Sequence, residues 1–400
     1  MAADLLEPRH RALFTQFQGI FRELEPDPGH PVSDQELARK LVQLGCAAHL
    51  IPAAYGGIGE AIDVRALCVL REALAYRNPE ADSIFAVHGL GSHPLVLAGS
   101  PQQRQELLPA AAKGAALFAF ALTEAEAGSD LSAISTTARR TGNSYLLNGS
   151  KRFISNAGIA THYTVFARTD SLDSPSTLRL RSGSGQAGRD ERGKSLSAFV
   201  VPEGAVGFIL KAKMEMISPH PIGELEFSNC EIPVASRIGE EGEGMKLALG
   251  TLDVFRCTVG AAAVGMAQRA LDEALDYSQS RIQFGAPLAS LQGVQFMLAE
   301  SAVELEAARL LVHRAAAAKD GGAPRVTLES AAAKYFATEA AQRIIDRSVQ
   351  IHGGNGLIRG AVVERLYRDI RALRIYEGAS EVQKVIIARH LLKSRRAPGG

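Results

Sequence analysis

A glutamate near the C-terminus has a sequence context suited to proton abstraction. Glu377 lies within Arg374-Ile-Tyr-Glu-Gly-Ala-Ser-Glu-Val-Gln383, directly before Gly378 and just ahead of a helical pattern that Ser380 and Glu381 open. A carboxylate at a break between helices can be directed into a cleft, as a general base acting beside a carbonyl requires. An ordinary capped helix would use the same residues, so this segment alone does not separate a catalytic from a structural glutamate.

Two segments in the middle of the chain could contact a polar heterocycle. Phe120-Ala-Leu-Thr-Glu-Ala-Glu-Ala-Gly-Ser-Asp130 passes from a strand pattern into a loop of small residues, where Gly128 permits close approach of a ligand. Leu147-Asn-Gly-Ser-Lys-Arg-Phe-Ile-Ser-Asn-Ala-Gly158 places Phe153 and Ser155 on one face of a strand, where they could stack on and hydrogen-bond a planar ring. A plain strand-to-turn junction and a core phenylalanine beside an exposed serine explain the same residues.

Two later segments have groups suited to a nucleotide. Arg281-Ile-Gln-Phe-Gly-Ala-Pro287, with Gln292, gathers a cation, an aromatic ring and amides at a turn between helices. These groups could bind a diphosphate and a nucleobase, although arginines also often cap helices. Gln350-Ile-His-Gly-Gly-Asn-Gly356 is rich in glycine but follows a helix, so it is not the strand–turn–helix dinucleotide fingerprint.

The histidines and cysteines show no metal-ligand spacing, so we assign no metal. His88 and His352 lie in apolar helical patterns and are expected to be core histidines. His220, between Pro219 and Pro221, is expected to be a loop residue. The four cysteines are far apart and form no Cys-x-x-Cys pair, which predicts reduced thiols.

The spacing of apolar residues along the chain predicts helices first, then strands, then helices again. Residues 5–112 have helical spacing, short β-rich runs occupy 116–227, and Asn148-Gly149 between two of these runs predicts a hairpin turn. The span Ser171–Lys194 is predicted to be a loop between strands. Four long amphipathic helices near 259–281, 291–319, 327–350 and 382–392 predict a bundle. This is an α+β order.

Length and charge restrict the class of protein. The 400 residues suffice for two or three domains, 46% of them are apolar, and the net charge is +1. Basic and acidic residues are interleaved, so no nucleic-acid partner is expected. We found no secretory signal and no apolar run near the roughly 20 residues that span a bilayer. These patterns predict a cytoplasmic protein with no membrane partner.

Taken together, the segments resemble the acyl-CoA dehydrogenase family of flavoenzymes over nearly the whole chain. Five signatures occur in the family's order: Leu122-Thr-Glu through Gly128-Ser-Asp130; Leu147-Asn-Gly with Lys151 and Ile154-Ser-Asn-Ala-Gly158; Arg281 with Phe284-Gly285 and Gln292; Gln350 with Gly353-Gly-Asn-Gly356; and Ile375-Tyr-Glu-Gly378. The resemblance implies an N-terminal α-helical domain over 1–115, a central β-barrel over 116–235 and a C-terminal four-helix bundle over 236–400. It also implies bound FAD and a homotetramer built as a dimer of dimers.

The resemblance further implies a role for particular residues. The flavin ring would be surrounded by Phe120, Leu122, Thr123, Phe153 and Ser155, with Ser155 near its N5 atom. The adenosine diphosphate part of a neighbouring protomer's FAD would meet Arg281, Phe284, Gln292, Gln350, Gly353 and Gly354. Residues Ala379 to Glu381 would close over the cofactor, with Ala379 and Glu381 in contact with it. Acyl-CoA would contact Ser129, Asp253, Arg256 and Gly378, and Ser129 would also reach the cofactor.

The implied reaction is α,β-dehydrogenation of an acyl-CoA thioester. Glu377 would remove the α-proton while the β-hydrogen leaves as hydride to flavin N5, giving a trans-2-enoyl-CoA, and an electron-transferring flavoprotein would accept the electrons. Burial should raise the pKa of Glu377 toward neutrality. Some relatives take their base from the helix that contains Phe255, which cannot act as one, so Glu377 is the sole candidate.

Other readings of the same residues stay open. A flavin-dependent oxidase or monooxygenase on this scaffold, a dehydrogenase of a carrier-protein-bound acyl group, and an idle FAD-binding subunit are the alternatives. Ala125-Glu126, Phe153 and Ala379 depart from the family's usual Pro-Gly, Trp and Thr. The segment Ile84–Gly89 has no arginine for a second carboxylate, which disfavours dicarboxylyl-CoA substrates. The sequence does not define the acyl group, the physiological electron acceptor or the pathway.

Overall fold

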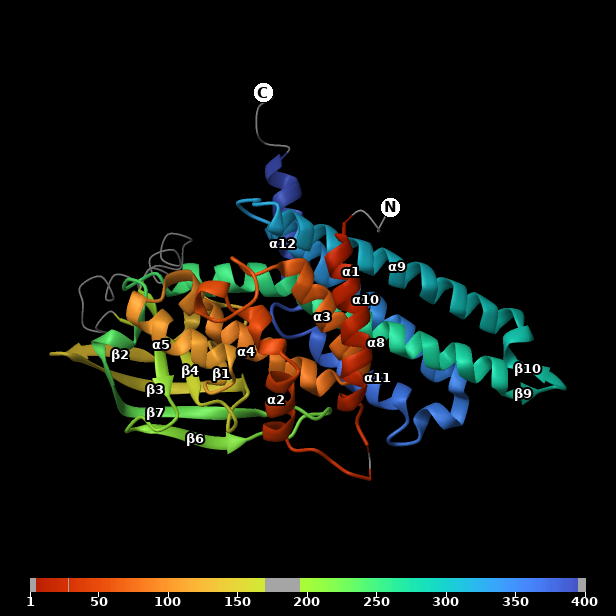
Figure 1. The fold of residues 1–400 in the computed structure, drawn as a ribbon, viewed down its shortest axis with the longest axis horizontal. Helices are drawn as coiled ribbons and strands as arrows, with labels where there is room; N and C mark the ends of the chain where they lie inside the picture. The colour runs from red at the N-terminus through yellow and green to blue at the C-terminus, as the bar shows by residue number, and fades with distance from the viewer. Residues whose placement is uncertain (1–4, 28, 170–194, 395–400) are drawn as a thin grey trace.

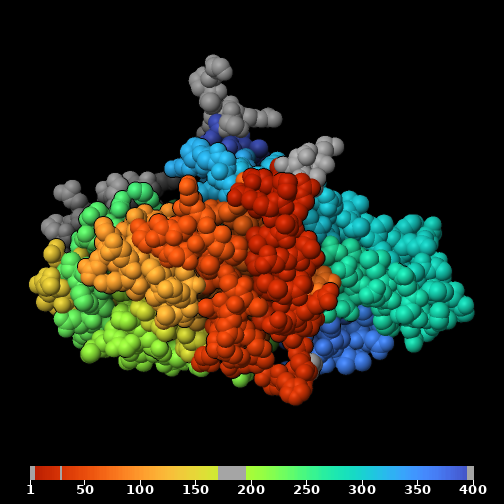
Figure 2. All heavy atoms as spheres, viewed as in Figure 1, coloured from red at the N-terminus to blue at the C-terminus, as the bar shows by residue number. Residues whose placement is uncertain are grey.

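The computed structural model describes residues 5–27, 29–169 and 195–394, and it has the predicted order of helices, sheet and helices (Figure 1). The predicted loop Ser171–Lys194 lies outside the described residues. The N-terminal helices lie between the strands and the far end of the C-terminal helices, and they cover the middle of one face (Figure 2). The predicted α+β class, with helical N- and C-terminal parts around a central β-structure, is confirmed.

Five N-terminal helices have sequence-encoded starts. They are α1 (Pro8–Ile20), α2 (Asp34–Gln43), α3 (Val64–Arg77), α4 (Pro79–Ala98) and α5 (Pro101–Ala112). At the first residue before each of α2 to α5, a side-chain oxygen accepts a backbone N–H three residues on; these caps are Ser33, Asp63, Asn78 and Ser100. Because α3 and α4 are buried along nearly their whole length, they form the layer between the sheet and the C-terminal helices.

The central part is one eight-stranded sheet. Its strands are β1 (Phe118–Ala121), β2 (Thr137–Thr141), β3 (Ser144–Ser155), β4 (His162–Arg168), β5 (Leu196–Pro202), β6 (Phe208–Lys213), β7 (Ile222–Pro233) and β8 (Arg237–Ile238). The order is β6-β7-β3-β2-β4-β5-β8, with β1 added in parallel to β4. The sheet encloses its own apolar core, which includes Tyr145, Tyr163 and Phe199.

The predicted hairpin at Asn148-Gly149 is wrong. These residues lie inside β3, where the pairing with β7 shifts register between Leu147 and Gly149. The tight turn instead joins β2 to β3 at Gly142-Asn143, because Thr141 pairs with Ser144. Gly149 has φ 142°, and a Cβ there would lie 2.7 Å from the Thr136 side chain, so the glycine serves a bulge and a close approach.

The C-terminal part contains α8 (Gly244–Ser280), α9 (Gln292–Asp320), α10 (Thr327–His352), α11 (Val362–Leu373) and α12 (Ser380–Ser394). The short strands β9 (Ile282–Gln283) and β10 (Ala286–Pro287) form a hairpin between α8 and α9. Helix α10 packs against the other four. Helix α11 was not among the predicted helices, because its arginines resembled a solvated face. It nevertheless buries Val363, Leu366, Ile370 and Leu373.

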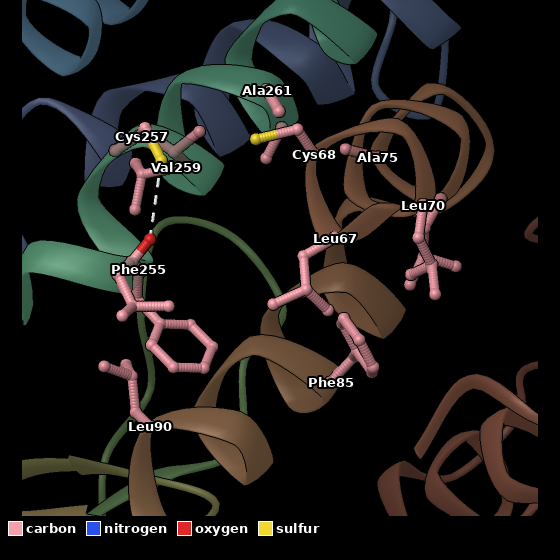
Figure 3. Close-up of a cluster of buried hydrophobic side chains, with 14 of the residues drawn as sticks. Leu67, Cys68, Leu70, Ala75, Phe85, Leu90, Phe255, Cys257, Val259 and Ala261 are labelled. Atoms are coloured by element: carbon pink, nitrogen blue, oxygen red, sulfur yellow. Dashed lines mark hydrogen bonds between the residues drawn. The ribbon is translucent and has the colours of Figure 1, made fainter. Parts of the chain in front are cut away.

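Helix α8 is the core helix of the molecule. By length and composition it could cross a membrane, but 78% of its most apolar 18-residue window is buried inside the protein. It packs against α3, α4 and α10. Figure 3 shows Phe255 projecting from α8 toward Leu90 on α4, with Cys257 and Cys68 buried nearby. All four cysteines are buried free thiols, as predicted.

Candidate functional site

Glu377 lies in the connection between α11 and α12, as the sequence predicted. Its φ is 51°, and that of Gly378 is 92°, so two successive left-handed residues turn the chain back on itself. Such a conformation is uncommon for a residue with a side chain and marks a position that its surroundings hold in place. A Cβ on Gly378 would lie 2.3 Å from the flexible end of the Gln383 side chain, which could move away, so it is the φ of 92° that favours glycine here.

Hydrogen bonds with side chains of α10 and α12 hold this connection at both ends. Glu339 of α10 accepts hydrogen bonds from Arg374 Nε at 2.9 Å and from Ser380 Oγ at 2.6 Å. Lys334 Nζ and Gln383 Nε2 each donate to the Gly378 carbonyl oxygen at 2.8 Å. The strained turn is therefore fixed by side chains of α10 and α12.

The electrostatics of Glu377 suit a general base. Its Oε2 atom is buried and has no hydrogen-bond partner among the described residues. Burial raises the pKa of Glu377 to about 7, against the positive charges of Arg71, Lys334 and Arg256, which lower it. A carboxyl with such a pKa is partly ionised near neutrality and free to take a proton.

An ion pair that the sequence did not reveal lies behind Glu377. Arg71 of α3 donates two hydrogen bonds to Asp82 of α4, Nε to Oδ1 at 2.9 Å and Nη2 to Oδ2 at 2.7 Å, and a third to Thr258 Oγ1 at 2.8 Å. Arg71 and Asp82 are each 1% exposed. The same two helices contain further charged residues, so the sequence did not single out this pair. Asp82 raises the pKa of Glu377, whereas Arg71 lowers it.

The predicted flavin-ring residues come together at the ends of β1 and β3. The Arg152 backbone N–H donates to the Thr123 carbonyl oxygen at 2.9 Å, which joins the two segments. Phe120 packs on Phe166 at a centroid distance of 4.9 Å, and Leu122 is buried. Phe153 has φ 56° and is 48% exposed, so its ring is directed out of the core. An exposed ring beside hydroxyls is the arrangement that a planar heterocycle would use.

A buried pair supports this arrangement. Lys151 Nζ donates to Glu124 Oε1 at 2.8 Å and to the Leu122 carbonyl oxygen at 3.1 Å. Glu124 also accepts from the backbone and hydroxyl groups of Ser135 and Thr136. Burial would raise the pKa of Glu124, but Lys151 and these donors lower it to about 2. The carboxylate therefore stays ionised and holds the end of β1 against β3.

Ser155 has a histidine partner that sequence reasoning missed. His220 was expected to be only a loop residue, but its Nε2 lies 2.6 Å from Ser155 Oγ and its Nδ1 lies 2.7 Å from Ser83 Oγ. Its neighbouring prolines gave no sign of these contacts. His88 behaves as predicted, because Nε2 contacts the Ala111 carbonyl oxygen and Nδ1 accepts from the Phe118 N–H.

The predicted substrate residues lie on α8 and around the Glu377 turn. Asp253 Oδ1 accepts from Arg256 Nη1 at 3.3 Å, and Asp253 Oδ2 accepts from Thr327 Oγ1 at 3.2 Å. Arg256 Nε is buried and has no hydrogen-bond partner within the described part of the chain, and it lies 3.9 Å from where a Cβ on Gly378 would be. Ser129 is exposed in the loop after β1, while Ala379 is half-buried and Glu381 exposed at the start of α12.

The predicted diphosphate residues do not join this site within one chain. Arg281, Phe284 and Gln292 are exposed on and beside the β9–β10 hairpin, and Phe284 is 93% exposed with φ 51°. Gln350, Gly353 and Gly354 are exposed where α10 ends. Ala274, Val294 and Ile351 pack together and join these segments. Figure 1 shows the hairpin at the opposite end of the molecule from the sheet.

Comparison with known proteins identifies the family. Three family models match consecutive parts of the chain: acyl-CoA dehydrogenase, N-terminal domain (residues 19–115), middle domain (119–230) and C-terminal domain (242–392). The chain belongs to the acyl-CoA dehydrogenase family. The resemblance drawn from the sequence motifs is thereby confirmed.

Individual relatives agree with the family models. A probable acyl-CoA dehydrogenase of Mycobacterium tuberculosis, FadE25, is 41% identical over 345 residues, which is 86% of this chain and 84% of that protein. The butyryl-CoA dehydrogenase of Megasphaera elsdenii superposes with a TM-score of 0.85 and 32% identity, covering 97% of this chain and 99% of that one. A crystal structure of an FAD-dependent dehydrogenase has a TM-score of 0.86 at 27% identity, covering 96% and 98%.

These likenesses agree with the geometry of the site. The enzyme is an oxidoreductase, an acyl-CoA dehydrogenase, and its family indicates a flavin cofactor. The exposed Phe153 ring, the Thr123 and Ser155 hydroxyls and the close approach of β1 to β3 fit a flavin ring.

Proposed function

We propose that this acyl-CoA dehydrogenase binds FAD and converts an acyl-CoA thioester to a trans-2-enoyl-CoA, with Glu377 as the α-proton base. The observation that carries the proposal is the Glu377 carboxylate, which has a buried, unpartnered Oε2 and a pKa of about 7 on a turn anchored from two helices. A buried carboxylate oxygen without a hydrogen bond lowers the stability of the fold. Its presence therefore indicates a function that outweighs this cost. The bound FAD would supply the acceptor of the β-hydrogen at N5.

The chain's own residues have separate tasks in this proposal. Phe120, Leu122, Thr123, Phe153 and Ser155 hold the flavin ring, and Lys151 with Glu124 keeps their two strands together. Asp253, Arg256, Ser129 and Gly378 position the thioester. The backbone N–H of Glu377 would donate to the thioester oxygen as negative charge develops there, an interaction worth about 2.7–4 kcal/mol in mutated enzymes.

The assembly and electron partner belong to the same proposal. Arg281, Phe284, Gln292, Gln350, Gly353 and Gly354 lie far from the ring-binding residues of their own chain, which favours a homotetramer whose protomers complete each other's FAD sites. We propose an electron-transferring flavoprotein as the electron acceptor. We place the enzyme in the cytoplasm, with fatty acid metabolism as its setting.

The deciding experiment separates the base from the cofactor. Purified enzyme would be mixed anaerobically with acyl-CoA thioesters of different lengths, and bleaching of the flavin spectrum recorded. We expect Glu377→Gln to keep its bound FAD and to lose bleaching by about 10²–10⁴-fold, the usual contribution of a general base. Glu273→Gln, which changes a glutamate paired with Arg269 on the distant part of α8, is the matched control and should bleach normally.

Other outcomes would identify the alternatives. Near-normal bleaching in Glu377→Gln would show that another group is the base. Oxygen consumption with peroxide or an oxygenated product would favour an oxidase or monooxygenase. A flavin that bleaches only with acyl-carrier-protein thioesters would identify a carrier-bound substrate.

A further inference from the structure

A hydroxyl–imidazole–hydroxyl chain connects α4 to the end of β3. His220 stands in the connection between β6 and β7, with its Nδ1 2.7 Å from Ser83 Oγ and its Nε2 2.6 Å from Ser155 Oγ. The loop that carries it is anchored. The Asn156 N–H donates to the Pro221 carbonyl oxygen at 2.7 Å, and Arg368 Nη1 donates to the Ile217 carbonyl oxygen at 2.8 Å.

The imidazole in this chain is neutral. Burial lowers the pKa of His220 to about 4, with a weak opposing effect from Asp34. A neutral imidazole has one N–H donor and one bare nitrogen acceptor, and either nitrogen can carry the proton. Since both nitrogens face hydroxyls, which donate and accept equally well, both tautomers of His220 are fully hydrogen-bonded.

The two tautomers leave Ser155 in opposite states. If His220 Nε2 carries the proton, it donates to Ser155 Oγ, and the Ser155 hydroxyl proton is free to point away from the ring. If Nδ1 carries the proton, it donates to Ser83 Oγ, and Ser155 must donate to Nε2 and can only accept from a further partner. Each arrangement contains one ring proton and two hydroxyl protons, so the exchange involves no net uptake or release of protons.

We propose that Ser83, His220 and Ser155 form a relay that switches Ser155 between donor and acceptor to match the redox state of the flavin. The inference rests on the proposed function, in which Ser155 faces flavin N5. That atom accepts a hydrogen bond when the flavin is oxidised and donates one when it is reduced. His220 is therefore a positioning residue that acts through Ser155, and Ser83 is what keeps both tautomers available.

The tautomer of His220 can be observed directly. Protein with ¹⁵N-labelled histidine would be studied by solid-state NMR with its FAD oxidised and then reduced by dithionite, without substrate. The chain has 10 histidines, and the His220 signals would be assigned by their loss in His220→Phe. We expect a neutral ring in both states, protonated on Nε2 in the oxidised enzyme and on Nδ1 in the reduced enzyme. The same tautomer in both states, or an imidazolium, would overturn the relay.

A matched pair of serine variants tests the same idea through the flavin potential. Ser83→Ala removes the hydrogen-bond partner of His220 Nδ1. A buried N–H without a partner is tolerated less well than a bare acceptor nitrogen. The variant therefore disfavours the Nδ1–H tautomer, which is the one that the reduced flavin needs. We expect its relative affinity for reduced FAD to fall about tenfold, which lowers a two-electron midpoint potential by about 30 mV. Ser92→Ala changes a buried serine of the same helix that donates to the His88 carbonyl oxygen, and should leave the potential unchanged.

Equal potentials in the two variants would contradict the relay. Its failure can be told from failure of the proposed function, because dithionite reduces bound FAD whether or not acyl-CoA does. A tautomer exchange without bleaching by any thioester would support the relay and refute the proposed reaction. A protein that takes up no FAD would refute both.

Discussion

At the scale of single residues, what the sequence could predict depended on local backbone chemistry. Glu377 was predictable because the glycine after it marks a turn, and the structure places that turn between two helices. His220 was not predictable, because its partners Ser83 and Ser155 come from two other elements. Arg71 and Asp82 are hidden for the same reason: their pairing exists only once α3 and α4 have packed. Side chains that act through partners on other elements can be recognised only once the fold is known.

The pKa of Glu377 leads to a prediction about pH. Burial raises this pKa from 4.5 to about 7, and only the ionised carboxylate can accept the α-proton. The rate of flavin bleaching by an acyl-CoA at low concentration should therefore fall about tenfold for each pH unit below 7 and level off above it. Stopped-flow measurements between pH 5 and 9 would record this fall in rate, which is the acidic limb of the pH–rate profile.

A variant of α10 tests whether ionisation of Glu377 causes the acidic limb. The positive charge of Lys334 lowers the pKa of Glu377, so Lys334→Met should move the limb to higher pH. Lys40→Met, which removes a lysine from the distant helix α2, should leave it in place. A limb that moves equally in both variants, or in neither, would mean that another group titrates.

At the scale of elements, the sequence predicted which segments are helical better than how strands turn. Apolar spacing predicted helices over most of the residues of α3, α4 and α5. Asn148-Gly149 was misjudged, because the same dipeptide that favours a hairpin also fits a bulge, and the pairing with β7 decided between them. Helix α11 was missed, since four arginines, three within it and one directly after it, outweighed its buried apolar stripe.

The Arg71–Asp82 pair should be what fixes α3, α4 and α8 behind the site. Removing one partner leaves a buried charge without compensation, so Arg71→Met and Asp82→Leu should each cost about 3–5 kcal/mol of unfolding free energy. The double variant should be more stable than either single one, because it leaves neither charge behind. Chemical denaturation followed by circular dichroism would measure all three.

A surface pair provides the control for this prediction. Lys211 and Glu224 lie 2.9 Å apart with the lysine side chain 50% exposed, so Lys211→Met should leave the free energy of unfolding nearly unchanged. If Arg71→Met cost as little, the buried pair would not be holding the three helices. If the double variant were the least stable, the two charges would have separate structural roles.

At the scale of the whole molecule, the order of helical, strand and helical parts followed from the sequence, whereas the layout of the cofactor residues did not. One chain holds the proposed ring-binding residues at the sheet and the proposed diphosphate-binding residues at the β9–β10 hairpin, at opposite ends of the molecule (Figure 1). Composition and periodicity do not show that two sets of residues serve different copies of a cofactor; only the family resemblance implied that division. The separation argues that FAD binding and assembly are a single property of this enzyme.

Phe284 allows that argument to be tested. A phenylalanine 93% exposed at φ 51° is expensive in an isolated chain, and a neighbouring protomer would cover it. Phe284→Asp should therefore give a smaller assembly in analytical ultracentrifugation and an FAD content reduced by about tenfold or more, as one lost aromatic contact and one buried charge imply. Val206→Asp puts the same charge at an apolar residue 82% exposed beside the sheet, and should change neither property. Full FAD occupancy in a Phe284→Asp monomer would show that each chain binds its cofactor alone, and the division of the site between protomers would then be wrong.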